Sequence, residues 1–191
     1  MTPANRDHEC RLRFSALYEA NYHLILGYAL RRTQHADALD VVSETFLVAW
    51  RRLGQVPHGD EARLWLYGTA RRVLANHERA ARRRGRLDGR LADEAATTSA
   101  ATAEHADGGV GAAFARLAPR DRELLGLVAW EGLDAAGIAR VVGCTRNAAR
   151  IRLHRARKRF AVALDEEVAD VKHRRPSGHV SWPPLGTEDA R

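Results

Sequence analysis

The chain has 191 residues and a formal net charge of +7, and 45% of its residues are hydrophobic while 29% are charged. This composition fits a soluble protein of one large or two small domains, and an aromatic content of only 6% favours small helical cores. Almost all of the basic residues are arginine, whose guanidinium group makes paired hydrogen bonds to phosphate and to bases, so we expect a polyanionic partner.

Several other classes of protein are disfavoured. The N-terminal segment lacks the apolar core of a signal peptide, and no later run reaches the length of a membrane span, so we expect a cytoplasmic protein without membrane insertion. A membrane surface would be the competing polyanion, but no basic segment carries a face rich in Trp, Phe and Leu. Cys10 and Cys144 are too few for a disulfide framework or a cysteine zinc site, and we expect neither a metal nor a cofactor.

The first part of the chain has the apolar periodicity of two helices, over about 11–32 and 36–53. In the second of these, apolar residues recur at alternating spacings of three and four, as in a helix that packs against antiparallel neighbours. The residues of this predicted packing stripe are Leu39, Val42, Phe46, Ala49 and Leu53.

A surface of mixed character adjoins that stripe. Asp40 and Glu44 are acidic, and they could serve only to solvate the helix. However, apolar surface beside acidic residues is also typical of a site that binds another protein, and we expect a partner here. The apolar residues off the stripe are Val41, Leu47, Val48 and Trp50.

A loop with Gly and Pro, 54–60, precedes a third predicted helix that begins with acidic and ends with basic residues, with Gly85 as its expected C-terminal cap. We expect Trp65 to pack rather than to stack on a base, and His77 to be a core or boundary histidine. The expected inward residues are Tyr67, Ala70, Leu74, His77 and Ala81. The remaining surface is basic and polar and includes Arg71, Arg72, Asn76 and Arg79.

Residues 86–111 contain no aromatic residue and lose apolar periodicity, so we predict a flexible linker between two helical domains, 11–85 and 112–165. In the second domain, Pro119 is expected to be the first residue of a helix. Residues 166–191 have the Pro, Gly and polar content of a disordered tail.

Residues 134–164 have the pattern of a helix-turn-helix, with one helix over about 134–142, a break at Gly143 and a second helix over about 146–164. Thr145 fits the N-cap position of the second helix. Arginine covers most of that helix apart from one apolar stripe. The residues of the stripe are Ala149, Leu153, Ala156, Phe160 and Ala163.

The start of this second helix carries residue types that can read bases. When such a helix enters a major groove, its N-terminal end reaches the base edges. Arginine, as at Arg146, can donate two hydrogen bonds to guanine, and asparagine, as at Asn147, can pair with adenine. The arginines could instead form only a solvated face, but the cap, the glycine break and the one-sided charge together favour DNA binding.

Taken in order, these segments resemble the bacterial RNA polymerase sigma factors of the sigma-70 family, in the small extracytoplasmic-function (ECF) group. Residues 11–85 are similar to the second region of the family and residues 112–165 to the fourth. The sequence DALDVVSETFLVAW resembles the helix that binds core polymerase, and ARLWLYGTARRVLANH resembles the helix that melts the promoter. The sequence from Leu117 to Arg157 resembles the C-terminal reader.

The resemblance implies three groups of site residues, with core RNA polymerase and promoter DNA as partners and an anti-sigma factor as a possible third. The residues expected to bind core polymerase are Asp40, Glu44, Phe46, Leu47 and Trp50. Those expected at the −10 element are His58, Arg71, Arg72, Asn76 and Arg79. Those expected at the −35 element are Thr145, Arg146, Asn147, Arg150, Arg152, His154 and Arg155. Two departures are Ser43, where the family usually has glutamine, and the loop 54–61, which has no aromatic ring.

The predicted fold is therefore all-α, with two small helical domains joined by a flexible linker. Promoter elements about two duplex turns apart are separated by roughly 70 Å. A segment of this length spans about 30 Å on average and about 90 Å when fully stretched. We therefore expect the free protein to be compact or variably arranged, and the polymerase to hold the domains apart.

Two rival functions account for less of the sequence. A helix-turn-helix regulator that acts without being a polymerase subunit would need only the C-terminal domain, which leaves the second basic helix and the mixed surface unexplained. An enzyme is disfavoured because the sequence has no His-Glu zinc motif, no phosphate-binding glycine loop and no plausible catalytic triad.

Overall fold

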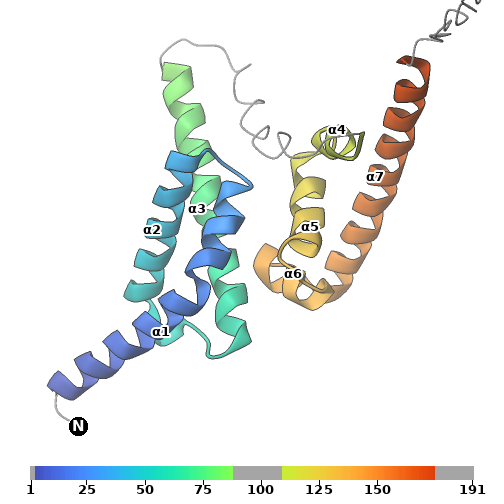
Figure 1. Ribbon diagram of the computed structural model, residues 1–191. Helices are drawn as coiled ribbons and strands as arrows, with labels where there is room; N and C mark the ends of the chain where they lie inside the picture. The colour runs from blue at the N-terminus through green and yellow to red at the C-terminus, as the bar shows by residue number, and fades with distance from the viewer. Residues whose placement is uncertain (1–2, 88–108, 175–191) are drawn as a thin grey trace, which may run out of the picture.

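The computed structural model describes residues 3–87 and 109–174, in which every regular element is helical (Figure 1). The first bundle consists of α1 (Pro3–Leu30), α2 (His35–Arg51), the 3-10 turn η1 (Leu53–Gln55) and α3 (Asp60–Leu87). The second consists of α4 (Gly109–Ala115), α5 (Pro119–Ala129), α6 (Ala135–Val142) and α7 (Arg146–Arg174). The predicted all-α class is thus confirmed, and no helix in the described ranges is long and apolar enough to cross a membrane.

The first bundle packs α2 against both α1 and α3. Its buried face is centred on Val41 and Thr45, and the Thr45 hydroxyl donates a hydrogen bond to the Val41 carbonyl at 2.7 Å, which satisfies this polar group inside the core. Four of the five residues of the predicted stripe, Val42, Phe46, Ala49 and Leu53, are buried, but the buried face is wider than the stripe and is shifted at one end. Leu39 was expected inside but is 42% exposed, whereas Val41 was expected off the stripe but is fully buried. A helix packed on two sides buries a wider face than a single stripe describes.

Several element boundaries differ from those expected. Helix α1 begins at Pro3, before the predicted start. Helix α3 continues through Gly85 to Leu87, so Gly85 is not a C-terminal cap. Helix α4 begins at Gly109, inside the segment expected to be linker; residues 88–108 of that segment and the tail from residue 175 lie outside the described residues.

Helix α7 also runs further than predicted, through Arg174, so the first part of the expected tail is helical. The extension packs against α4, and the guanidinium group of Arg116 binds the carboxylates of Glu166 and Glu167. Phe114 of α4 packs edge-to-face on Phe160 at 6.3 Å between ring centroids. These contacts supply the tertiary support that the polar sequence of the extension did not reveal.

The helix-turn-helix forms as its sequence predicts. The Asp134 carboxylate accepts a hydrogen bond from the Gly137 amide at 2.8 Å and caps α6. Gly143 ends α6 with a φ of +74°, a left-handed conformation that favours glycine. The Thr145 hydroxyl accepts from the Ala148 amide at 3.2 Å at the start of α7. In the predicted stripe of α7, four residues are buried and Phe160 is half-buried.

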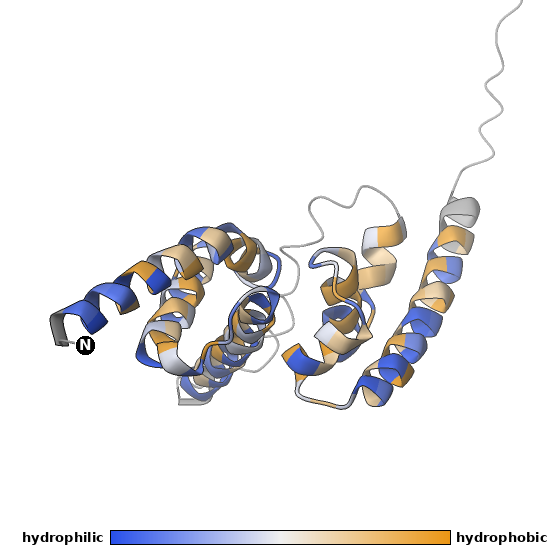
Figure 2. Ribbon diagram, turned by 90° about the horizontal axis from the view of Figure 1, so that it is seen from below, coloured by the Kyte–Doolittle hydropathy of each residue, from blue (hydrophilic) through white to orange (hydrophobic). Residues whose placement is uncertain are grey.

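The two bundles pack against each other, with α6 lying on α3 (Figures 1 and 2). One continuous hydrophobic cluster includes Ile25, Val41 and Leu66 from the first bundle and Leu127 and Ile138 from the second. The described domains therefore form a closed arrangement.

Candidate nucleic-acid surfaces and helix groove

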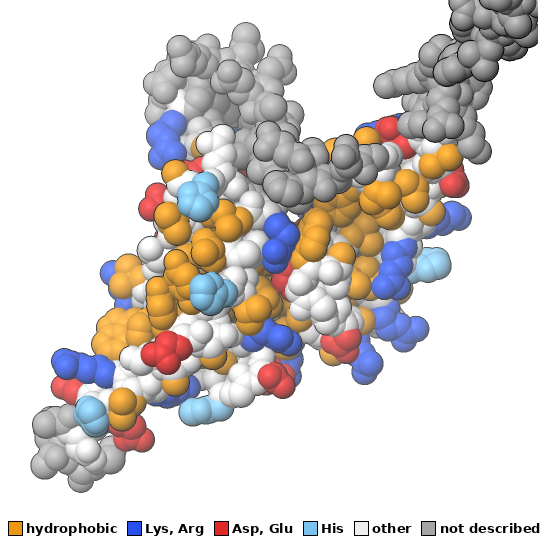
Figure 3. All heavy atoms as spheres, in the orientation of Figure 1, with side chains coloured by type: hydrophobic (Ala, Val, Ile, Leu, Met, Phe, Trp, Pro, Cys, Tyr) orange, Lys and Arg blue, Asp and Glu red, His pale blue; other side chains and the backbone are white. Residues whose placement is uncertain are grey.

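The basic surface of α7 faces away from its own domain. Ala149, Leu153 and Ala156 are buried, and the residues on the opposite side of the helix are exposed (Figure 3 shows Lys and Arg side chains gathered along α7). All the residues expected to read the −35 element are exposed: Thr145, Arg146, Asn147, Arg150, Arg152, His154 and Arg155. This arrangement leaves the helix free to enter a groove of duplex DNA.

An open hollow of about 900 Å³ lies between α7 and the turn that joins α5 to α6. Four of the expected readers line it, namely Asn147, Arg150, His154 and Arg155. Thr145, Arg146 and Arg152 are not among the residues that line it.

The hollow also contains Ile151, which sequence reasoning missed. Ile151 is 44% exposed and lies opposite the buried stripe, between Asn147 and His154 on the same face. The signal was available in the sequence, because an aliphatic residue in the middle of a cationic face contradicts the pattern of a surface helix.

Two arginine side chains on the basic surface of α3 form hydrogen bonds within their own helix. Arg72 donates from Nε to the Gly68 carbonyl at 2.9 Å, and Arg79 donates to the Asn76 side-chain oxygen at 2.7 Å. Arg72, Asn76 and Arg79 are exposed, whereas Arg71 is half-buried. These residues share one helix, as expected.

The loop before α3 is less open than expected. His58 is exposed, but Val56 is buried and its carbonyl accepts a hydrogen bond from Arg13 at 2.5 Å. Val56 is therefore a core residue, although it lies in the predicted loop 54–60. Between η1 and α3, the exposed residues are His58 and Gly59.

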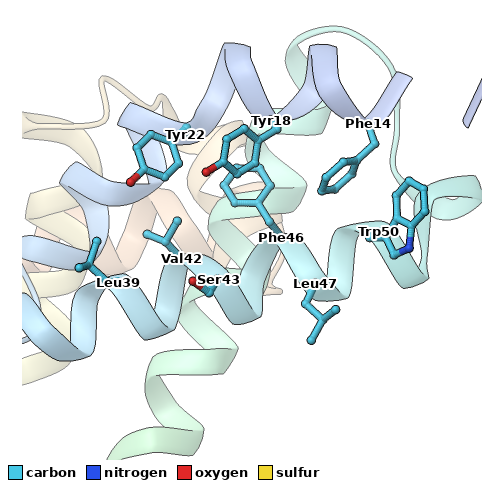
Figure 4. A pocket seen from close by; sticks show the side chains of 9 residues that line it. All are labelled: Phe14, Tyr18, Tyr22, Leu39, Val42, Ser43, Phe46, Leu47 and Trp50. Carbon is cyan, nitrogen blue, oxygen red and sulfur yellow. The ribbon is translucent and has the colours of Figure 1, made fainter. Parts of the chain in front are cut away.

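An aromatic groove of about 390 Å³ runs between α1 and α2 (Figure 4). The rings of Tyr18 and Phe46 pack at a tilt with centroids 4.7 Å apart, and Phe14 packs edge-to-face on Trp50 at 5.1 Å. The residues that line the groove are Phe14, Tyr18, Tyr22, Leu39, Val42, Ser43, Phe46, Leu47 and Trp50. Figure 4 places the three α1 rings on one wall and the α2 side chains on the other.

The groove only partly coincides with the residues expected to bind core polymerase. Leu47 and Trp50 are 45% and 43% exposed, while Phe46 is almost fully buried and forms the floor. Asp40 is exposed but does not line the groove. Glu44 instead binds the ring of His77 at 2.9 Å, and this contact explains the half-buried position of that histidine. The contribution of α1, above all Tyr22, was not predicted.

A charged cluster joins the two domains. In the turn after α1, Arg32 binds Glu123 of α5 at 2.8 Å and Glu131 at 3.1 Å, and Arg31 binds Glu131 at 3.0 Å. The Glu131 side chain has no exposed surface. The Tyr28 hydroxyl donates to Glu123 at 2.8 Å. The ion pairs and the hydrogen bond together tie the end of α1 to α5 and its following turn.

Burial and charge perturb the groups of this cluster. Burial raises the pKa of Tyr28 well above its usual value, and the negative charge of Glu123 raises it further. Burial lowers the pKa of Arg32, but the neighbouring Tyr28, Glu123 and Glu131 more than compensate, so its pKa is raised. Both groups therefore keep their protons throughout the physiological range.

A second contact between the domains lies along α3. Glu61 forms an ion pair with Arg140 of α6. At Gly68, a Cβ atom would lie 3.5 Å from the Val141 carbonyl oxygen, and at Gly137 of α6 it would lie 3.4 Å from the Leu64 side chain. The two helices thus approach closely at positions where glycine leaves room.

No group of three or more His, Cys, Asp or Glu residues that could hold a metal ion occurs within residues 3–87 and 109–174. Cys10 is exposed and Cys144 is half-buried, and both are free thiols.

Comparison with known proteins matches both domains to one family. The family described as "Sigma-70 region 2" matches residues 17–84, and the family described as "Sigma-70, region 4" matches residues 109–160. The chain is 30% identical over 160 residues to the ECF RNA polymerase sigma factor SigL of Mycobacterium tuberculosis, covering 79% of this chain and 88% of SigL. It is 34% identical over 150 residues to SigC of the same organism, covering 71% of this chain and 73% of SigC.

The fold has a relative among solved structures. The structure of CnrH in complex with the cytosolic domain of CnrY superposes with a TM-score of 0.54, at 24% identity, covering 81% of this chain and 88% of the other. Both matched regions and the similarity to SigL confirm the resemblance read from the sequence. The chain belongs to the sigma-70 family of RNA polymerase sigma factors, in its extracytoplasmic-function group.

Proposed function

We propose that this sigma factor binds core RNA polymerase and directs initiation at specific promoters, with α7 reading the −35 element as duplex and α3 holding the opened strand of the −10 element. The observation that carries the proposal is the pair of separate basic helices, one in each of the two regions matched to the family. A single DNA-binding module would have use for only one of them.

The exposed face of α7 supports its role as the duplex reader. Asn147, Arg150, Ile151 and His154 follow one another at helical spacing along the hollow, near the capped N-terminus of the helix. Asparagine and arginine provide paired hydrogen bonds to adenine and guanine, and isoleucine suits a thymine methyl group. The N-terminal turns of α7 are therefore the proposed source of sequence preference.

The composition of α3 supports its role with the separated strand. Opening a duplex requires unstacking energy of a few kcal/mol per extruded base, which binding contacts must recover. Arg72 and Arg79 can contact phosphates, and Asn76 and His58 can hydrogen-bond to bases. Residues 54–61 hold no aromatic ring on which a base could stack. These polar contacts must therefore offset the unstacking energy.

The aromatic groove and its exposed rim are the proposed contact with core polymerase. Leu47 and Trp50 offer large apolar side chains at the surface, and the exposed carboxylate of Asp40 lies on the same helix. Buried aromatic anchors surrounded by polar groups are typical of protein interfaces. An anti-sigma factor is proposed as a second protein partner, because covering an exposed apolar groove is one way to prevent polymerase binding.

The closed arrangement must change when both promoter elements are bound. Elements two duplex turns apart are separated by roughly 70 Å, whereas the two domains lie in direct contact in the closed form. We therefore propose that the polymerase separates the domains.

Transcription in vitro from a promoter library, with and without core polymerase, tests this function. A sigma factor yields promoter-specific transcripts only when the core enzyme and this chain are both present. If the chain selects duplex sites tightly by itself and adds nothing to the polymerase, the rival function, a helix-turn-helix regulator that works outside the polymerase, is correct instead.

A further inference from the structure

We propose that Arg13 of α1 is a positioning residue for recognition of the −10 element, because it anchors the loop that carries His58. The proposal rests on the proposed function and deepens it: His58 contacts a base of the opened strand, and Arg13 acts through His58 without touching DNA. The sequence pattern does not indicate this role, since Arg13 lies 43 residues before the carbonyl group that it binds.

The loop between η1 and α3 is short, and both of its ends are fixed. At the first end, the Val56 amide donates to the Leu53 carbonyl at 3.2 Å, and the side chains of both residues are buried. At the second end, the Ala62 amide donates to the Gly59 carbonyl at 3.1 Å as α3 begins. Residues 57–59 therefore connect two anchored points.

Arg13 supplies a contact at the first end that the local backbone does not. Val56 is extended, with φ −71° and ψ 123°, as expected for a residue that precedes a proline. Its carbonyl group lies between η1 and α3, outside the hydrogen bonds of either element, and a backbone carbonyl at a buried residue needs a donor. Nη2 of Arg13 donates to this oxygen at 2.5 Å. The bond therefore fixes the direction in which the chain leaves the core.

The position of Arg13 on α1 makes the anchor rigid. Arg13 is half-buried, next to Phe14 and one helical turn before Leu17, and both of these side chains pack against the hydrophobic core. A hydrogen bond from a charged donor is also stronger than one between neutral groups. The loop is therefore tied to a helix that the core itself holds in place.

His58 is the side chain whose position depends most directly on this anchor. It is exposed, it lies two residues after Val56, and it is followed by Gly59 at a φ of +62°, which favours glycine. A hydrogen bond to a base is selective only when the direction of the donor or acceptor is fixed. Without the anchor, His58 would still meet the strand, but in several orientations that suit different bases. Loss of Arg13 should therefore lower selectivity more than affinity.

Holoenzymes made from core polymerase and full-length variants test the proposal on a promoter library with a fixed −35 element and randomised −10 bases. Arg13→Met removes the donor but keeps an unbranched side chain of high helix propensity. Arg13→Gln is also neutral, and its amide ends well short of the guanidinium position. His58→Ala removes the proposed reader. Arg11→Met is the matched control, because Arg11 is an exposed arginine of the same helix and its loss changes the charge equally.

Sequencing of the transcribed templates gives the base preference at each −10 position. We expect His58→Ala to lower the preference at one position by about fivefold, the net value of one hydrogen bond. Both Arg13 variants should lower it at the same position by a similar factor. Adding Arg13→Met to His58→Ala should lower it no further, because the two residues act as one unit. The affinity of the Arg13 variants for core polymerase should match that of Arg11→Met.

Unchanged preferences in both Arg13 variants would overturn the proposal. An equal loss at every −10 position would also overturn it, because a general structural defect has that effect, and so would a further loss in the double variant. If His58→Ala keeps every −10 preference while wild type still gives promoter-specific transcripts, the positioning role is wrong and the proposed function stands. If wild type gives no such transcripts with core polymerase, the proposed function is wrong and the positioning role fails with it.

Discussion

The hydroxyl group of Tyr28 in α1 donates a 2.8 Å hydrogen bond to the carboxylate of Glu123 in α5, 95 residues later in the chain. The bond crosses the boundary between the two family regions. Tyr28 is fully buried and its ring lies 5.3 Å from that of Tyr67, so the phenol belongs to the core of the first domain and the carboxylate to the second. Tyr28 therefore contributes both to the core of the first domain and to its contact with the second.

This relationship predicts a response to alkaline pH. Burial and the charge of Glu123 raise the pKa of Tyr28 in the closed form above the 10.0 of a free tyrosine. A raised folded-state pKa contributes stability that is present below pH 10 and is lost as pH rises through the folded value. We expect tyrosinate absorbance to contain a late-titrating component that Tyr28→Phe reduces. An unchanged titration curve in Tyr28→Phe would contradict the buried position of this phenol.

Two residues of the aromatic groove, Trp50 and Phe46, are expected to have different roles, one in binding and one in stability. Trp50 is 43% exposed at the rim, so Trp50→Ala should reduce affinity for core polymerase by about 2 kcal/mol, roughly 30-fold, with little loss of stability. Phe46 is buried, so Phe46→Ala should destabilise the domain by about 3–5 kcal/mol. Polymerase titrations and thermal unfolding measure the two effects.

The control for this pair is Leu12→Ala, which removes an exposed apolar side chain of α1 that does not line the groove. It should change neither quantity. If Trp50→Ala binds polymerase as well as Leu12→Ala does, the groove is not the contact.

Ile151 offers a test of base reading by α7. Loss of contact with one thymine methyl group should reduce affinity by about fourfold, the value expected for one buried methyl group. We therefore expect uracil in place of a −35 thymine to weaken binding by the wild-type holoenzyme but not by the Ile151→Ala holoenzyme. Alanine favours helix more than isoleucine does, so the variant should fold normally.

Val162→Ala is the matched control, because Val162 is an exposed aliphatic residue further along the same helix. It should keep the full sensitivity to uracil. If Ile151→Ala also keeps it at every −35 thymine, Ile151 does not contact a methyl group.

The sequence was sufficient to predict the helix-turn-helix in detail. Asp134, Gly143 and Thr145 act over a few neighbouring residues, so their effects on the local backbone can be read without knowledge of the rest of the fold. The buried stripe of α7 followed for the same reason, since one helical face packs on one domain.

The features that were missed depend on contacts between distant segments. The extension of α7 is held by α4, and the burial of Glu131 depends on Arg31 and Arg32, about a hundred residues earlier. The exposure of Leu39 and the burial of Val41 depend on the packing of α2 against both α1 and α3. Periodicity within one segment contains no information on which other segment will supply a partner.

The division of labour between α7 and α3 is tested most directly by separating promoter binding from promoter opening in the holoenzyme. Footprinting measures the first step, and permanganate reactivity of unpaired thymines measures the second. We predict that Arg150→Ala impairs binding of the −35 duplex, whereas Arg72→Ala combined with Arg79→Ala leaves that binding intact and abolishes opening. The same defect at the same step in both variants would contradict the account.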